Sequence, residues 1–291
     1  MKNILITGSK GQLGNDLQVL FKKSELKNLV NAHFTDVDTL DICDKNQLHA
    51  IFTKHKFAYV VNCAAYTAVD KAETEFEKAM LVNSEAPHLL ADICNEFETK
   101  LIHISTDYVF DGNKFTPYTE EDLVNPISAY GKSKLSGENT VIQSGCNYLI
   151  IRTSWLYSTF GNNFVKTIIR VGNERPELKV VFDQIGSPTY AADLANAILK
   201  IIWKVEKGEK QFEQGIYHFS NEGVCSWYDF AIEIIKGKQL KCKVTPVESF
   251  EYPTPTKRPA YSVLNKRKLK STFDITIPHW RDSLNSCLAG L

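Results

Sequence analysis

Residues 2–14 read KNILITGSKGQLG, and this stretch decides the fold class. Its first six residues, 2–7, form a short apolar run that predicts a buried strand, and apolar residues recur at helical spacing over 12–22. Between the two, Gly8 and Gly11 let the chain turn sharply and let backbone N–H groups approach a pyrophosphate, while the helix N-terminus adds positive charge. The stretch therefore predicts the strand, turn and helix of a dinucleotide-binding unit.

Strand and helix signals continue to alternate beyond this unit. Further strands are expected at 33–37, 58–62, 100–105, 148–153, 179–182 and 215–220. Helices are expected at 44–55 (capped by Asp44), 74–97, 126–144, 163–171, 190–205 and 227–235. Such alternation predicts parallel strands joined by right-handed crossovers, with helices on both faces. The expected fold class is α/β, a Rossmann-type doubly wound parallel sheet.

The last third of the 291 residues changes character. Prolines at 246, 253, 255 and 259 exclude long helices and central strands there. We therefore expect a smaller, loop-rich C-terminal substrate-binding lobe. The NAD(P)-binding domain is expected to span 1–153, with about 186–221 returning to the sheet. The lobe would then comprise about 154–185 and 222–291.

Composition narrows the function classes. The 34 basic and 34 acidic side chains cancel, which argues against a nucleic-acid binder or a binder of anionic membranes. No apolar run approaches 18 residues, so no membrane-spanning segment is expected. The seven cysteines are scattered and form no Cys-x-x-Cys pair, which indicates reduced thiols. We expect a cytoplasmic protein.

Tyr130 and Lys134 form a Tyr-x-x-x-Lys pair within an expected helix, so they share one helix face. A free tyrosine has a pKa of about 10, and a nearby ammonium together with an oxidised nicotinamide would stabilise its anion. The preceding strand ends at Ser105 and Thr106, where ligands sit in a doubly wound sheet. These residues predict a site for proton transfer beside a nicotinamide cofactor.

The second strand is expected to end near Asp36. A carboxylate there can bond the adenosine ribose and would repel a 2′-phosphate, which favours NAD. Asp38 and Asp41 lie nearby, so NADPH remains open as well as NADH.

Beyond these residues, the chain resembles the dTDP-4-dehydrorhamnose reductase family of the extended short-chain dehydrogenase/reductase superfamily. The motifs that carry the resemblance are NCAAYTAVDKAE at 62–73, STDYVF at 105–110, RTSWLY at 152–157, GNNF at 161–164, DQIGSPT at 183–189, and YPTP at 252–255 with Arg258, Pro259 and Ser262. They extend over nearly the whole chain. The resemblance implies a nucleotide-sugar 4-ketoreductase whose product is dTDP-L-rhamnose, with Tyr130 as proton donor.

Site residues follow from the resemblance position by position. It implies a catalytic set of Thr106, Tyr130 and Lys134. It implies cofactor contacts from Gly8, Gly11, Gln12, Leu13, Asp36, Asp41, Ile42, Ala64, Ala65 and Tyr66, in addition to Tyr130 and Lys134. It implies sugar contacts from Thr106, Asp107 and Trp155. Arg258 is expected to clamp the diphosphate, since a guanidinium suits phosphate oxygens. Asn83 matches an asparagine that supports the lysine.

The resemblance also bears on metals and partners. Some family members are described as binding magnesium through carboxylates, and Asn15 and Ala192 are taken here as the matching positions. Neither side chain can supply charge, so we predict no metal. The expected partner is the nucleotide-sugar substrate, with no nucleic acid and no membrane. Related enzymes are often dimers, which leaves a homodimer open.

Four other functions are compatible with this fold and cofactor site to different degrees. A nucleotide-sugar 4,6-dehydratase needs a Thr-Asp-Glu pattern, but Tyr108 stands at its third position. An epimerase is disfavoured by the closer motif match. A 4-ketoreductase that makes a 6-deoxy-L-talose nucleotide stays open, because facial selectivity lies in pocket geometry. A non-catalytic regulator of the methionine adenosyltransferase β-subunit type would keep the fold, yet every catalytic position here holds a competent residue.

Overall fold

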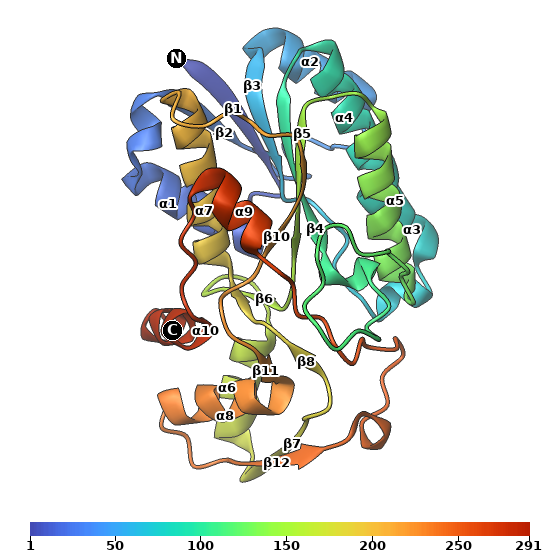
Figure 1. Cartoon of the computed structure of the whole chain (residues 1–291), viewed down its shortest axis with the longest axis vertical. Coiled ribbons are helices and arrows are strands. Elements are labelled where there is room, and N and C mark those ends of the chain that lie inside the picture. Colours follow the sequence, from blue (N-terminus) through green and yellow to red (C-terminus); the bar gives the residue numbers. More distant parts are fainter.

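A six-stranded, fully parallel sheet forms the centre of the computed structural model, which describes residues 1–291 (Figure 1). Its strand order is β10-β5-β4-β3-β1-β2. The strands are β1 Lys2–Thr7, β2 Val30–Phe34, β3 Phe57–Asn62, β4 Lys100–Thr106, β5 Tyr148–Thr153 and β10 Gly215–Phe219. The order reverses between β1 and β3, so a crevice opens beyond the carboxyl ends of these strands. The predicted α/β doubly wound fold is confirmed.

Helices cover both faces of this sheet (Figure 1). One face carries α1 (Gln12–Lys23) and α7 (Ala191–Glu206), and the other carries α2 (Lys45–His55), α4 (Ala86–Glu96) and α5 (Ala129–Gln143). Two buried apolar clusters fill the spaces between sheet and helices. This arrangement fixes the strand ends rigidly, because each strand is packed from above and below.

A smaller lobe continues below the carboxyl ends of the strands (Figure 1). Its helices are α6 Phe164–Glu174, α8 Trp227–Gly237 and α10 Trp280–Ala289. Its short strands are β6 Leu156–Tyr157, β7 Glu177–Val181, β8 Ile185–Gly186, β9 Thr189–Tyr190, β11 Cys225–Ser226 and β12 Lys243–Val247. They share a third buried cluster centred on Phe230 and Trp280. The lobe thus has its own core beside the cleft.

The long helix expected at 74–97 is interrupted. Helix α3 (Phe76–Met80) runs into a π-helical turn, Leu81–Glu85, before α4 begins. Such turns are frequent at functional sites because they redirect side chains. Here the π turn carries Asn83, which is fully buried.

The structure differs from the sequence prediction at three further elements. The strand expected at 33–37 is β2, which begins three residues earlier, because Val30 to Phe34 pair in register with β1. Helix α10 was missed, although Trp280, Leu284, Cys287 and Leu288 recur at helical spacing and are all buried. Strand β12 was also missed. It contains Pro246 and pairs on one side only, with β7, where a missing N–H is tolerated.

Helix α9 (Arg267–Phe273) falls within the range expected for the lobe, yet its Leu269 and Phe273 are buried in the cluster of the main sheet. The reason is apolar spacing: these two side chains, followed by Ile275 and Ile277, cover the sheet beside β10 and α7. The other boundaries of the lobe stay a prediction.

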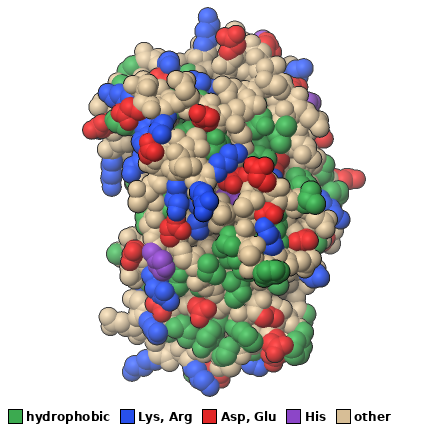
Figure 2. Space-filling model, in the orientation of Figure 1, with side chains coloured by type: hydrophobic (Ala, Val, Ile, Leu, Met, Phe, Trp, Pro, Cys, Tyr) green, Lys and Arg blue, Asp and Glu red, His purple; other side chains and the backbone are tan.

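Both signs of charge are interspersed over the face in Figure 2, whereas hydrophobic side chains gather on its lower half, over the smaller lobe. All seven cysteines are free thiols. No helix has the length and apolar character needed to cross a membrane.

Candidate active site

The crevice at the reversal of strand order is a cleft of about 860 Å³. It runs from the turn after β1, past the ends of β3, β4 and β5, to the lobe. Of the residues expected in the site, those that line it are Gly8, Gly11, Gln12, Leu13, Asp36, Asp41, Ile42, Ala64, Ala65, Thr106, Asp107, Tyr130, Lys134 and Trp155. Tyr66 and Arg258 are not among the lining residues. One cleft therefore gathers most of the predicted set from six separate chain segments.

The glycine turn has the close approaches that a dinucleotide cradle requires. Gly8 has φ +63°, and a Cβ there would stand 2.6 Å from the backbone nitrogen of Ala64. A Cβ on Gly14 would stand 2.3 Å from the carbonyl oxygen of Gly8, so the first helix packs directly against the turn. Any larger residue would displace the backbone that faces the cleft. The residues present fit a pyrophosphate at this end.

The far end of the cleft, where adenosine is expected, carries charge of both signs. Asp36 accepts hydrogen bonds from the backbone N–H groups of Lys10 (2.8 Å) and Val37 (2.9 Å). The ammonium of Lys10 pairs with Asp38 at 2.5 Å, and both side chains are exposed. These bonds hold Asp36 where it is expected to meet a ribose hydroxyl. The Lys10 ammonium lies near it and adds a positive charge that the sequence did not predict at this end.

At the catalytic end, Thr106 closes strand β4 and Tyr130 lies in the first turn of α5. The Thr106 side chain is 6% exposed, that of Tyr130 is 9% exposed and that of Lys134 is 2% exposed. Burial raises the pKa of Tyr130 above its usual value, while a hydrogen bond with the Thr106 hydroxyl opposes the rise. The phenol therefore keeps its proton at neutral pH, as a proton donor must.

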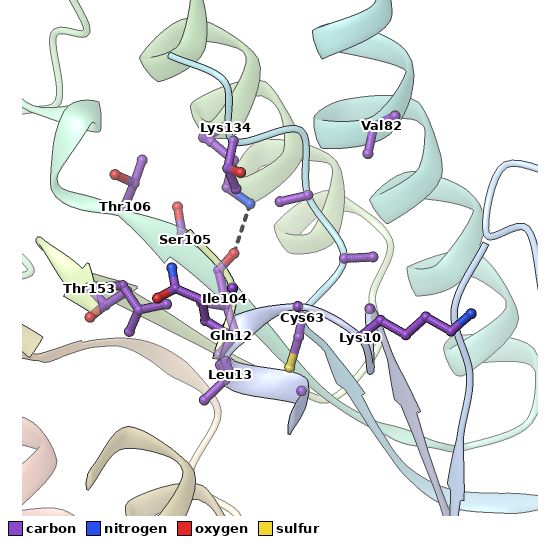
Figure 3. Close-up of a pocket in the computed structure, with 18 of the residues that line it drawn as sticks. Lys10, Gln12, Leu13, Cys63, Val82, Ile104, Ser105, Thr106, Lys134 and Thr153 are labelled. Atoms are coloured by element: carbon purple, nitrogen blue, oxygen red, sulfur yellow. Dashed lines mark hydrogen bonds between the residues drawn. The ribbon is translucent and has the colours of Figure 1, made fainter. Parts of the chain in front are cut away.

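Lys134 lies one helical turn beyond Tyr130 and reaches down toward β4 (Figure 3). Its Nζ donates a hydrogen bond to the carbonyl oxygen of Ile104 at 2.8 Å. Burial lowers the pKa of Lys134 to about 8, and the carboxylate of Glu138 opposes this. The Lys134 side chain is therefore still largely an ammonium at neutral pH. Its one hydrogen bond, to the Ile104 carbonyl, leaves other N–H groups free to bind a ligand.

Hydrogen bonds join Asn83, expected to support Lys134, to Tyr66, expected to contact the cofactor. Asn83 accepts from the backbone N–H of Tyr66 at 2.8 Å and donates to the Ser133 hydroxyl at 3.0 Å, and it makes no bond to Lys134. The Tyr66 hydroxyl donates to Glu75. Asn83 thus contacts the residue directly before Lys134, and its support of the lysine stays a prediction. The π turn instead ties the chain after β3 to α5.

Two residues line the part of the cleft expected to hold the sugar. Trp155 has φ +47° and stacks on Trp227 with ring centroids 3.6 Å apart, so a helix of the lobe holds the indole in place. Asp107 is 2% exposed, and its Oδ2 has no hydrogen-bond partner. Burial raises the pKa of Asp107 to about 6. An orphaned buried acceptor at a cleft wall suits a hydroxyl-bearing ligand.

Arg258 lies beside the cleft and is already paired. Its Nη2 donates to both carboxylate oxygens of Asp70 at 2.8 Å, and its Nη1 donates to the Tyr108 hydroxyl at 3.0 Å. The Tyr108 ring meets Tyr130 edge-on, with centroids 5.5 Å apart. Tyr108 thus lies between Arg258, the expected diphosphate clamp, and Tyr130, the expected proton donor. Arg258 is already paired with a carboxylate of the protein itself.

Acidic residues, Asp16 and Asp193, directly follow positions 15 and 192. Asp16 and Asp193 are close enough that the charge of Asp193 helps burial to raise the pKa of Asp16 to about 6. No group of three or more His, Cys, Asp or Glu side chains is placed to hold a metal ion. The absence of a metal stays a prediction.

Several lining residues had been given no role. Lys10, Val82, Thr153 and the segment 161–163 all face the cleft. Asn163 donates to the Gln12 side chain at 2.9 Å, which joins the lobe to the glycine turn. The GNNF motif was the available signal for this segment. Val82 had none, because only the π turn brings it to the cleft.

The order of strands, the cradle at their reversal and the tyrosine–lysine pair beyond β4 place the protein in the class of short-chain dehydrogenase/reductases. Comparison with known proteins narrows the class. The family model of the RmlD substrate binding domain matches residues 1–291, and the chain belongs to this family.

Relatives of the chain share its full length. A dTDP-4-dehydrorhamnose reductase of Aggregatibacter actinomycetemcomitans is 39% identical and covers 99% of both chains. The structure of a dTDP-4-dehydrorhamnose reductase of Clostridium acetobutylicum is 45% identical, with a TM-score of 0.91 and coverage of 99% of this chain and 98% of that one. That of Bacillus anthracis, solved in complex with NADP, is 38% identical, with a TM-score of 0.92 and full coverage of both chains.

Proposed function

We propose that this chain reduces dTDP-4-dehydro-6-deoxy-L-mannose (dTDP-4-dehydrorhamnose) to dTDP-L-rhamnose with NADPH or NADH. The observation that carries the proposal is the convergence of Thr106, Tyr130 and Lys134 at one end of a cleft whose other end is a glycine cradle. Full-length membership in the RmlD family supports the same reaction.

The chain's own residues divide the work at the sugar. When bound, the reduced nicotinamide supplies the hydride that reaches C4 of the sugar. Tyr130 donates its proton to the developing C4 alkoxide, and the Thr106 hydroxyl bonds the same oxygen. The phenol carries its proton at neutral pH before the reaction, since its pKa lies above the usual value. Lys134, as an ammonium, holds the nicotinamide ribose and stabilises the tyrosinate that remains.

The lobe end of the cleft is proposed to hold the nucleotide sugar. Asp107 supports this role with an unpartnered buried oxygen that can accept a sugar hydroxyl. Trp155, clamped by Trp227, forms a flat wall for the sugar. Arg258 is proposed to bind the diphosphate, and it then exchanges the Asp70 carboxylate for phosphate oxygens, which also accept charge-assisted hydrogen bonds.

The adenosine end supports use of either cofactor. Asp36 can bond the ribose hydroxyls of NADH. The Lys10 ammonium, exposed and held only by Asp38, can meet the 2′-phosphate of NADPH. A balance of one acid and one mobile cation explains why neither cofactor is excluded.

The remaining expectations stay proposals. The residues 1–153 and about 186–221 form the NAD(P)-binding domain, and the remainder, apart from α9, forms the lobe. The partner is the nucleotide sugar, without nucleic acid, and the protein acts in the cytoplasm; a homodimer remains open.

Coupled turnover tests the function. The ketosugar is generated from dTDP-glucose with a 4,6-dehydratase and an epimerase, and nicotinamide absorbance is followed after this protein is added with NADH or NADPH. We expect oxidation of the cofactor and a dTDP-L-rhamnose product by NMR. A talose product would retain the mechanism and change the facial choice. Cofactor binding without oxidation would overturn the proposed substrate.

A further inference from the structure

A buried ion pair lies directly behind the catalytic residues. Glu138 on α5 and Arg152 on β5 have side chains 1% and 3% exposed. Arg152 donates from Nε to Oε1 of Glu138 at 2.9 Å and from Nη2 to Oε2 at 2.6 Å. Its guanidinium also stacks on the Phe110 ring, 5.1 Å from the centroid. The proposed reaction assigns no role to this pair.

The carboxylate of Glu138 also holds the strand end that carries Thr106. The Ser105 hydroxyl donates to Oε1 of Glu138 at 2.5 Å. Ser105 directly precedes Thr106, whose hydroxyl acts on Tyr130. Glu138 thus connects β4, β5 and α5 through one pair of oxygens, immediately below the reacting groups.

Glu138 lies four residues after Lys134, so the two side chains share a helix face. The other titratable groups that act on Lys134 or respond to its charge are Cys63 after β3 and His103 on β4. Burial raises the pKa of the Cys63 thiol to about 12, and burial holds the pKa of His103 well below its usual value. Both groups are therefore neutral near pH 7.

Consequently, the Glu138 carboxylate is the main group that opposes the effect of burial on Lys134. An ammonium that is 2% exposed needs such a partner, because burial disfavours its charged form. Arg152 shares this carboxylate from β5 and offsets part of its charge, and the net effect of Glu138 on Lys134 is still to raise its pKa against burial.

We propose that Glu138 is a positioning residue of the reaction, whose carboxylate keeps Lys134 in its ammonium form and, through Ser105, fixes the strand end that carries Thr106. This inference rests on the proposed reduction. It adds a fourth side chain, outside the cleft lining, that sets the pH range in which the tyrosine–lysine pair works.

The test replaces Glu138 by Gln, which keeps the shape and removes the charge. We expect the alkaline limb of the kcat/KM–pH profile to move down by about one pH unit, because loss of an opposite charge lowers the pKa of an ammonium. The ¹³Cε resonance of Lys134, assigned by its loss in Lys134→Met, should titrate at correspondingly lower pH. This NMR titration reads Lys134 without any turnover, so it decides the inference even if the ketosugar is not the substrate.

Two further variants separate positioning from packing. The double variant Glu138→Gln/Arg152→Met removes the guanidinium that the single variant leaves buried without its carboxylate, and it should fold where the single variant does not. Its Lys134 titration should stay shifted. Glu138→Asp keeps the charge and should leave the titration near that of the parent protein. Return of the double variant to the parent's pH profile, or an unmoved Lys134 resonance in either Gln variant, would overturn the inference.

A matched control is Glu206→Gln. Glu206 also accepts from a buried side chain, the Tyr59 hydroxyl at 2.7 Å, and pairs with Lys2, but it lies on α7 away from the cleft. Its pH profile should coincide with that of the parent protein.

Discussion

At one end of the cleft, Thr106, Tyr130 and Lys134 are carried by β4 and α5 and are almost inaccessible to solvent. On the side expected to hold the nucleotide sugar, Trp155 and Arg258 lie outside the helices of the structure, and each is held by a residue distant in the chain. The first group is positioned by regular backbone, whose hydrogen bonds set the geometry before any ligand arrives. The second is positioned by single side-chain contacts that a ligand can replace.

This difference indicates a division between chemistry and recognition. Buried groups on rigid elements lose little entropy when the reaction begins and keep their shifted pKa values. In the proposed reaction, Arg258 exchanges Asp70 for the diphosphate, which suits selection of a substrate. Changes at the rigid end should therefore lower kcat, and changes at the other end should raise KM.

The largest effect is expected from Tyr130→Phe, which removes the proton donor and leaves the buried ring in place. We expect kcat to fall by about 10²–10⁴, the usual contribution of general acid catalysis. The matched control is Tyr108→Phe, whose hydroxyl only accepts from Arg258. Steady-state kinetics of the two variants should differ widely, and near-normal kcat in Tyr130→Phe would remove the tyrosine from the mechanism.

Arg258→Met should act on binding instead. Loss of charged hydrogen bonds to the diphosphate should raise KM for the nucleotide sugar roughly 10- to 100-fold, with kcat changed little. Titration of cofactor binding by nicotinamide fluorescence should be unaffected. Arg170→Met, at an exposed pair with Glu174, provides the control. A fall in kcat with unchanged KM would place Arg258 at the catalytic end.

A smaller effect is expected at the adenosine end from Lys10→Met. The variant loses the cation that can meet a 2′-phosphate, so KM for NADPH should rise roughly three- to tenfold. KM for NADH should stay the same, since Asp36 remains. Equal loss for both cofactors would show that Lys10 acts on the turn itself.

The seam between domain and lobe offers a prediction on stability alone. The Ser158 hydroxyl donates to Asp16 at 2.6 Å, and burial raises the pKa of Asp16 to about 6. Because the folded-state pKa lies above the unfolded one near 4, stability is highest at low pH and is lost as Asp16 ionises between about pH 4 and 6. Asp16→Asn should thus gain on the order of 2 kcal/mol in free energy of unfolding above pH 6.

At pH 4 the same variant should differ little from the parent protein. Urea unfolding at pH 4 and pH 7 measures both values, and kcat should not change. An equal difference at the two pH values would mean that Asp16 does not titrate in this range.

The fold class could be predicted from the sequence because its signals are local. Apolar residues at strand and helix spacing, Asp44 as a cap and the glycine turn each follow from a few adjacent residues. At β2 the local signal is weak, and the predicted strand begins three residues too late. No residue spacing in the sequence indicates the π turn at 81–85. Helix α10 does have a local signal, because its apolar residues recur at regular helical spacing.

Within the candidate site, local sequence patterns predict the residues that lie within one element or at one strand end. These are the glycine cradle, Thr106 after β4, and Tyr130 with Lys134 on one helix face. Tertiary structure alone decided the pairs that join distant segments: Glu138 with Arg152, Trp155 with Trp227, Asp16 with Ser158, and Arg258 with Asp70, which is 188 residues away. The physical reason is that periodicity encodes which face of an element is buried, whereas the partner of a buried charge depends on the path of the whole chain.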